Sequence, residues 1–182
     1  MSLRRVTPGW VLLIACIIAT LSALVTMRLW TIPALRAATG GLDVFDVLIQ
    51  GYSPDYVALY LDVLPDAARD LQLGAHRALD TLFVAGFTAT LSVASYLLAR
   101  RWNLVLALSL GVIPLFYFAF EMLENAQVAV ILTHPGPHPA MAAAASRFTV
   151  LKAQALVFAL SAVLFLISAR SFELAFAPEE KR

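Results

Sequence analysis

Ionisable side chains interrupt long apolar runs of this chain, at positions where they could do acid–base chemistry. Asp80, Glu121 and Glu124 are carboxylic acids, and Lys152 is a lysine inside such a run. A charged side chain at the centre of a membrane span costs about 2.5–3.5 kcal/mol on insertion scales, so each one indicates a function. We therefore predict Glu121, Glu124 and Asp80 as catalytic acids or bases, with Lys152 holding an anionic group.

Helical spacing gathers further polar groups around these acids. On one predicted helix, Tyr117, Glu121 and Asn125 are four residues apart and share a face. On another, His76 precedes Asp80 by one turn. The predicted ligand-binding residues are those that this spacing places beside the acids, namely Asn125, Lys152, Thr149, His76 and Tyr117.

Two other interpretations of the same residues remain open. A pair between Glu124 and Lys152, bridged by Asn125, could merely hold two helices together. However, carboxylates remain once the lysine is paired, and they need a proton or a cation. A metal site is disfavoured because Glu-x-x-His pairs, which build metal sites in helix bundles, do not occur here. We predict no metal and no cofactor.

The elements that must position these residues are membrane helices. Of 182 residues, 61% are hydrophobic and 14% charged, whereas soluble domains are about 45–50% apolar and about 25% charged. Nucleic acid is excluded as a partner, since 13 Lys and Arg balance 12 Asp and Glu. We predict a single all-α domain, a four-helix transmembrane bundle. Its spans are expected at about residues 10–30, 78–99, 103–132 and 147–169.

Charge distribution predicts the orientation of these spans in the inner (plasma) membrane. Basic residues mark the cytoplasmic side, which holds both termini: Arg4, Arg5, Arg100, Arg101, Arg170, Lys181 and Arg182. The opposite side receives a segment at about 31–75 with six Asp and two Arg. Such a long connection should be partly helical, and Ser53-Pro54-Asp55 predicts a helix that begins at Pro54 and ends near Leu64. This extracytoplasmic segment could shield helix ends or gate a site beneath it.

Most of the chain resembles a family of uncharacterised bacterial four-span membrane proteins. The pattern that carries the resemblance is Gly51-Tyr52-Ser53, Arg69 eleven residues before Asp80, Glu121-x-x-Glu124-Asn125, and Thr149-x-x-Lys152. The chain differs from it in having Ala68-Arg69 and Gln72 where Gly-Arg-x-x-Tyr is common, and Glu121 where Asp is common. The resemblance implies the four-span architecture and these site residues, but no reaction.

Two functions are expected from these observations. In the first, the site binds or chemically alters a small amphiphile or membrane lipid that enters from the outer leaflet, with the acids as proton donors or acceptors. In the second, the same acids carry an ion in proton- or cation-coupled transport. This function would require a homo-oligomer, because four membrane spans are few for a pore enclosed by a single chain. A purely structural membrane protein is the remaining possibility.

Overall fold

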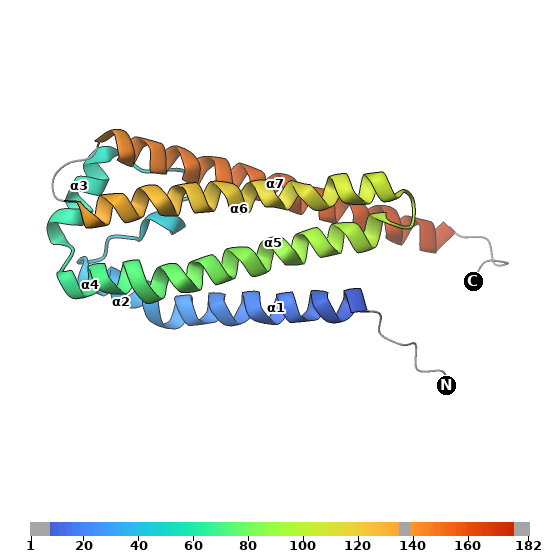
Figure 1. The fold of residues 1–182 in the computed structure, drawn as a ribbon, viewed down its shortest axis with the longest axis horizontal. Coiled ribbons are helices and arrows are strands. Elements are labelled where there is room, and N and C mark those ends of the chain that lie inside the picture. The colour runs from blue at the N-terminus through green and yellow to red at the C-terminus, as the bar shows by residue number, and fades with distance from the viewer. Residues whose placement is uncertain (1–7, 135–138, 177–182) are drawn as a thin grey trace.

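The computed structural model describes residues 8–134 and 139–176, which form helices and their connecting segments, without strands. Four long helical stretches lie side by side, with the shorter helices at one end (Figure 1). Arg4, Arg5, Lys181 and Arg182 lie outside the described residues, as do residues 135–138. The predicted all-α, four-helix bundle is confirmed.

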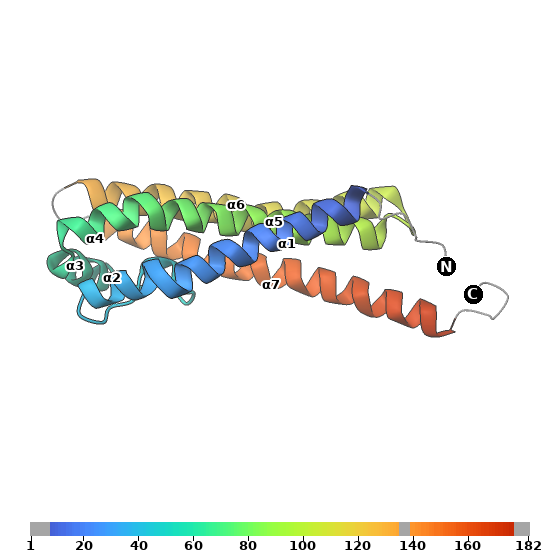
Figure 2. The same ribbon diagram turned by 90° about the horizontal axis from the view of Figure 1, so that it is seen from below.

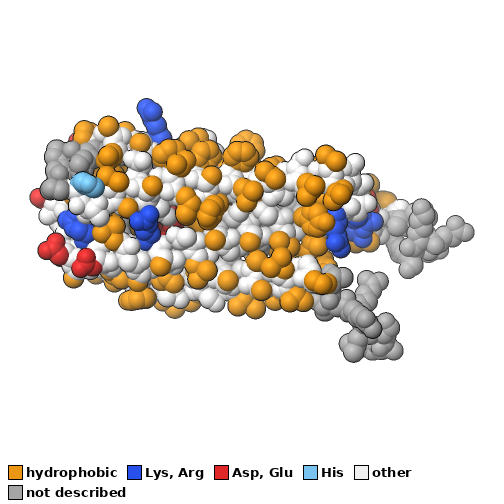
Figure 3. Space-filling model, viewed as in Figure 1, with side chains coloured by type: hydrophobic (Ala, Val, Ile, Leu, Met, Phe, Trp, Pro, Cys, Tyr) orange, Lys and Arg blue, Asp and Glu red, His pale blue; other side chains and the backbone are white. Residues whose placement is uncertain are grey.

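Four helical stretches are long and apolar enough to cross a membrane, which is typical of a multi-pass membrane protein: residues Pro8–Ala38, Asp66–Ala99, Leu104–Thr133 and Pro139–Phe176. Most large hydrophobic side chains on their outer faces are exposed. Hydrophobic and uncharged atoms cover the middle of the molecule, while charged side chains gather mainly toward its two ends (Figure 3). A surface of this kind suits lipid contact, because hydrocarbon solvates apolar side chains but not charges.

The first stretch is longer than the sequence predicted. It consists of α1 (Pro8–Thr26), a π-helical turn η1 (Met27–Thr31) and α2 (Ile32–Ala38). Pro33 lies in the first turn of α2, where its missing N–H breaks the regular ladder, and the wider π turn lets the chain stay helical there. The connection expected to begin near residue 31 therefore begins at residue 39.

The second stretch also begins earlier than the predicted span, at Asp66 rather than near residue 78. It runs through α4 (Asp66–Leu71), a second π-helical turn η3 (Gln72–His76) and α5 (Arg77–Ala99). Asn103 caps the next helix, α6 (Leu104–Thr133), by accepting hydrogen bonds from two backbone N–H groups. The last helix, α7 (Pro139–Phe176), extends beyond the predicted span at both ends.

Residues 39–65, here called the lid, cover one end of the bundle. The lid contains η2 (Phe45–Val47) and α3 (Pro54–Val63), and the Ser53 side chain caps α3 as predicted. Its core is the fully buried ring of Phe45, which packs against Tyr52 and Tyr60. Burial of such aromatic side chains stabilises the lid as a folded unit rather than a loose connection.

Two contacts fasten the lid to α7. The backbone N–H of Tyr52 donates to Oγ of Ser146 (2.8 Å). Gly51, with φ +88°, lies so close to α7 that a Cβ atom there would come within 2.7 Å of the same oxygen. The lid therefore approaches α7 by its backbone, which only glycine permits in this conformation.

The helix α5 is central to the bundle and contacts α1, α6 and α7. Gly86 allows its close approach to α1, since a Cβ atom there would lie 2.6 Å from Oγ1 of Thr20. Asp80 and His76 lie at the lid end of this stretch. The polar residues predicted from the sequence thus lie in the half of the bundle that the lid covers.

Candidate functional site

A buried cluster of three charged side chains joins α6 to α7 near the lid and is here called the ion pair. Nζ of Lys152 lies 2.9 Å from Oε1 of Glu121 and 2.6 Å from Oε2 of Glu124. The hydroxyl of Thr149 donates to the other oxygen of Glu124, Oε1, at 2.7 Å. The structure therefore brings together both predicted catalytic glutamates and two predicted ligand-binding residues.

Sequence spacing explains why these four side chains meet. Glu121 and Glu124 are three residues apart on α6, and Thr149 and Lys152 are three apart on α7, so each pair lies on one helix face. Both faces point into the bundle: Glu121 and Glu124 are each 1% exposed and Lys152 is 4% exposed. Removing Lys152 would leave two buried carboxylates without a counter-charge, which is costly, so both glutamates depend on the lysine.

A second contact links α5 to α6 beside this ion pair. Nδ2 of Asn125 donates to Oδ2 of Asp80 at 2.9 Å, and Asp80 is buried. The negative charges of Asp80 and Glu121 are close enough to repel each other. Asp80 and Asn125 thus belong to the same polar layer as Lys152, as the sequence predicted.

His76 lies in the same layer but is bonded to residues that the sequence did not single out. Its Nε2 lies 2.8 Å from Oδ2 of Asp46 in the lid, and its Nδ1 lies 2.8 Å from Oγ1 of Thr31. In its neutral form the imidazole donates to the carboxylate and accepts from the hydroxyl, and in its protonated form it donates to both oxygens. Thr31 and His76 each lie in a π-helical turn, η1 and η3, and the two turns contact each other.

Two side chains of the lid have pKa values that are shifted by burial and by charged residues of this polar layer. Burial raises the pKa of the Asp46 carboxyl, but the hydrogen bond and charge of His76 outweigh burial, so the pKa lies below its ordinary value. Burial also raises the pKa of the Tyr52 hydroxyl, and the negative charge of Glu124 raises it further. Asp46 is therefore anionic and Tyr52 neutral at physiological pH, with the tyrosine hydroxyl near the buried glutamate.

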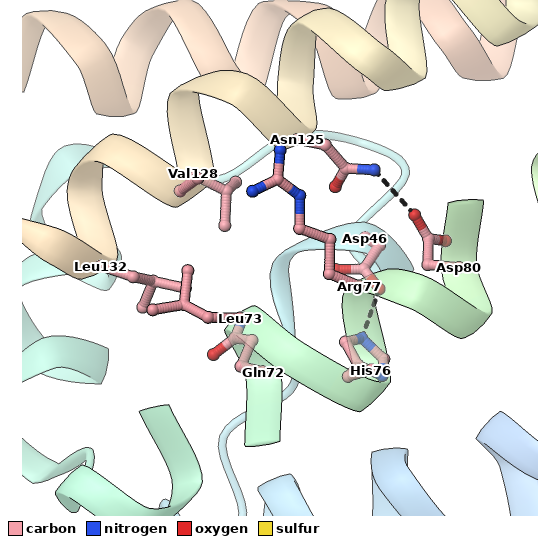
Figure 4. A pocket seen from close by; sticks show the side chains of 10 residues that line it. Asp46, Gln72, Leu73, His76, Arg77, Asp80, Asn125, Val128 and Leu132 are labelled. Atoms are coloured by element: carbon pink, nitrogen blue, oxygen red, sulfur yellow. Dashed lines mark hydrogen bonds and ion pairs between the residues drawn. The ribbon is translucent and has the colours of Figure 1, made fainter. Parts of the chain in front are cut away.

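A small cavity opens between Asp46, His76, Asp80 and Asn125 (Figure 4). The Arg77 side chain extends along it toward Asn125 (Figure 4). The cavity volume is about 10 Å³, which matches one water molecule with polar partners. It has no room for an amphiphile in this conformation, although protons or single waters fit.

Three further polar groups continue the layer along α5. The hydroxyls of Thr88, Ser92 and Ser95 are buried, and none has a hydrogen-bond partner among the described residues. They follow an i, i+4, i+7 pattern and so share one face of α5, running from the acids toward the end opposite the lid. A buried hydroxyl without a partner costs roughly 1–3 kcal/mol, so water molecules are expected beside these three groups.

Tyr117 is the predicted site residue with the least connection to the others. It is buried one turn from Glu121, and its ring packs edge-on against Phe87.

The structure describes no cluster of three His, Cys, Asp or Glu side chains that could hold a metal ion within residues 8–134 and 139–176. The polar layer is therefore best described by its charges: the four carboxyls of Asp46, Asp80, Glu121 and Glu124 against the cations Lys152 and Arg77, with the imidazole of His76.

The first prediction concerns the cation of the ion pair. Replacing Lys152 by Met leaves two buried carboxylates without a counter-charge, so the free energy of unfolding should fall by about 3–5 kcal/mol. Adding Glu121→Gln and Glu124→Gln should recover part of this loss. Unfolding by a denaturing detergent measures the difference, with Arg147→Met, an exposed position on the same helix, as the control. A Lys152→Met variant as stable as wild type would contradict the pairing.

Comparison of the chain with protein-family models, with curated proteins and with solved structures finds no match. The resemblance to four-span bacterial proteins therefore stays a prediction. An activity has to be inferred from the buried polar layer itself, from its excess of carboxyl groups and from the hydroxyls that continue it along α5.

Proposed function

We propose that this chain moves protons in the inner (plasma) membrane, as the proton-binding subunit of a small proton-coupled transporter. The observation that carries the proposal is the excess of acids in the buried layer: four carboxyls face Lys152 and Arg77, with one imidazole beside them. Negative charges in excess of the cations are expensive in a membrane interior. Bound protons neutralise these negative charges, and the carboxyl groups release the protons again when their surroundings change.

The contacts favour a route that begins at the lid. Asp46, whose side chain is 16% exposed, is bonded to His76, and the small cavity joins both to Asp80. An imidazole accepts a proton on one nitrogen and gives it up from the other, which makes histidine a common proton shuttle. Asp80 lies close enough to Glu121 for their negative charges to repel each other, and Glu121 shares Lys152 with Glu124.

The unpartnered hydroxyls suggest how the route continues toward the opposite end of the bundle. Thr88, Ser92 and Ser95 lie about 12, 18 and 22 Å beyond Asp80 along α5. Hydroxyls both donate and accept hydrogen bonds, so with single waters between them they form a chain that conducts protons. Glutamates that only fasten α6 to α7 would not require this polar stripe on a third helix.

Binding of a small amphiphile or lipid is the second candidate. It is favoured by a groove of about 430 Å³ between α6 and α7, a volume that suits a small ligand. Phe120 and Leu151 line this groove and adjoin Glu121 and Lys152 in the chain. The side chains of Glu121 and Glu124 face inward, however, so the helices would have to separate before a bound amphiphile could reach these acids.

We further propose that the lid faces the outside and that both termini are cytoplasmic. Arg101 and Arg170 both pair with Glu173 at the end opposite the lid, which supports the positive-inside orientation. The lid and α4 carry the acids Asp55, Asp62, Asp66 and Asp70 at the other end. In the view of Figure 3, most of the visible acidic side chains lie at the lid end, where basic side chains also occur, and basic side chains lie at the opposite end.

The second prediction tests proton movement. Vesicles that contain the purified protein, loaded with a pH-sensitive dye and given an inside-negative potential, should acidify faster than protein-free vesicles. Glu121→Gln should abolish the difference, because an amide carries no exchangeable acid proton. Asp62→Asn, which removes an exposed lid acid, should leave the rate unchanged. A rate equal to that of protein-free vesicles would contradict the proposal and favour amphiphile binding.

The third prediction tests the orientation. In a Cys16→Ser background, a membrane-impermeant maleimide added to intact cells should label Asp62→Cys but not Arg101→Cys, both of which are exposed positions. Permeabilised cells serve as the control, because both positions should then react. The reverse pattern in intact cells would show that the lid faces the cytoplasm.

A further inference from the structure

An exposed seam runs along the outer face of α7. Every member is exposed, and the spacing between neighbours alternates between three and four residues: Leu151, Gln154, Phe158, Ser161, Phe165, Ser168 and Phe172. This is the heptad repeat that keeps one helix face against a partner helix over many turns. No helix of the described chain covers it, and α7 diverges from the other helices toward its C-terminal end (Figure 2).

Polar residues occupy every second position of this seam. Gln154, Ser161 and Ser168 are seven residues apart, and between them lie phenylalanines, of which Phe158 is 71% exposed. Within residues 8–134 and 139–176, none of the three polar side chains has a hydrogen-bond partner. Polar side chains on membrane helices commonly bond across to a neighbouring helix, and small residues such as serine let two backbones approach closely.

The depth of Gln154 makes its lack of a partner costly. It lies about 10 Å along the helix axis from Arg147 and about 24 Å from Arg170, the two basic residues nearest the ends of the charge-free outer surface. Since the hydrocarbon core is about 30 Å thick, the carboxamide faces lipid tails. An amide in contact with hydrocarbon loses the hydrogen bonds that water would supply.

We propose that the seam on α7 binds the same seam of a second copy of this chain, forming a parallel homodimer. Two copies in one membrane share an orientation, so their α7 helices pair parallel and in register, and identical residues face each other across the two-fold axis. A carboxamide both donates and accepts, so Gln154 is complementary to itself, and the same holds for the hydroxyls of Ser161 and Ser168. A lipid tail offers none of these hydrogen bonds.

The shape of the surface supports this partner. Gln154 and Phe158 lie between two grooves, of about 430 Å³ toward α6 and about 370 Å³ toward the lid residues Ile49 and Gln50. A ridge with a groove on each side is the surface into which a second helix packs its own ridges. Phe165 and Phe172 line a third groove of about 480 Å³ farther along α7, so the seam continues beyond Ser161.

The dimer is inferred from α7 alone and does not depend on the proposed proton movement. It would, however, supply the oligomer that four spans need if they carry a transport path. The buried ion pair lies on the inward face of α7, and the seam lies on its outward face. Variants of the seam therefore leave Lys152 and its partners in place, and the two proposals fail independently.

Oxidative cross-linking of the purified protein in lipid vesicles tests the dimer. In a Cys16→Ser background, Gln154→Cys and Ser161→Cys should each form a disulfide-linked dimer, because paired seam positions bring the two Cβ atoms close. Leu164→Cys is the matched control, since Leu164 is 63% exposed on the same helix but lies off the seam. Equal cross-linking at all three positions, or none at the two seam positions, would overturn the proposal.

The contribution of Gln154 is measured by the monomer–dimer equilibrium in vesicles of varied protein-to-lipid ratio. Gln154→Leu should raise the dissociation constant about three- to tenfold, in line with a hydrogen bond between membrane helices. Leu164→Ala, which leaves the seam intact, should not change it. An unchanged constant for Gln154→Leu, or a wild-type chain that stays monomeric with lipid in the grooves, would overturn the proposal.

Discussion

Lys152 is enclosed by two carboxylates inside a bundle from which water is largely excluded. Its pairing with Glu121 and Glu124 fixes α6 against α7, and Thr149 supplies a further hydrogen bond to Glu124. Removing Lys152 would leave two carboxylates that the protein interior does not solvate, so this contact holds the register of the two helices. The α5 helix is then joined to α6 by the hydrogen bond from Asn125 to Asp80.

The lid depends on the same layer. Asp46 from η2 reaches His76, and Tyr52 lies where the charge of Glu124 acts on its hydroxyl. A change in the charge of the buried acids would therefore alter the forces that hold the lid. Because His76 also bonds to Thr31, it joins the two π-helical turns, and such turns frequently occur at functional sites. Lid and acids thus form one electrostatic unit.

The sequence predicted the bundle and most of the polar layer because both follow from local rules. Charge-free apolar runs locate the spans, and helical spacing places Glu121, Glu124 and Asn125 on one face. Asp46 and Thr31 could not be assigned to the site, since their contacts with His76 bring together residues 30 and 45 positions apart. No repeat or spacing rule describes a contact between a lid and two π-helical turns. The helical continuation to Ala38 was missed because Pro33 normally signals a break.

We expect the carboxyl groups in excess of the cations to hold a proton within the bundle. Infrared spectroscopy of the protein in lipid measures this directly, because only a protonated carboxyl absorbs at the carboxylic C=O stretch and the band shifts in deuterated water. The wild type should show such a band near neutral pH, and Glu121→Gln or Asp80→Asn should remove or displace it, whereas Asp62→Asn should not. A wild-type spectrum with only ionised carboxylates at neutral pH would show that the layer holds no such proton and would leave it as a structural contact between helices.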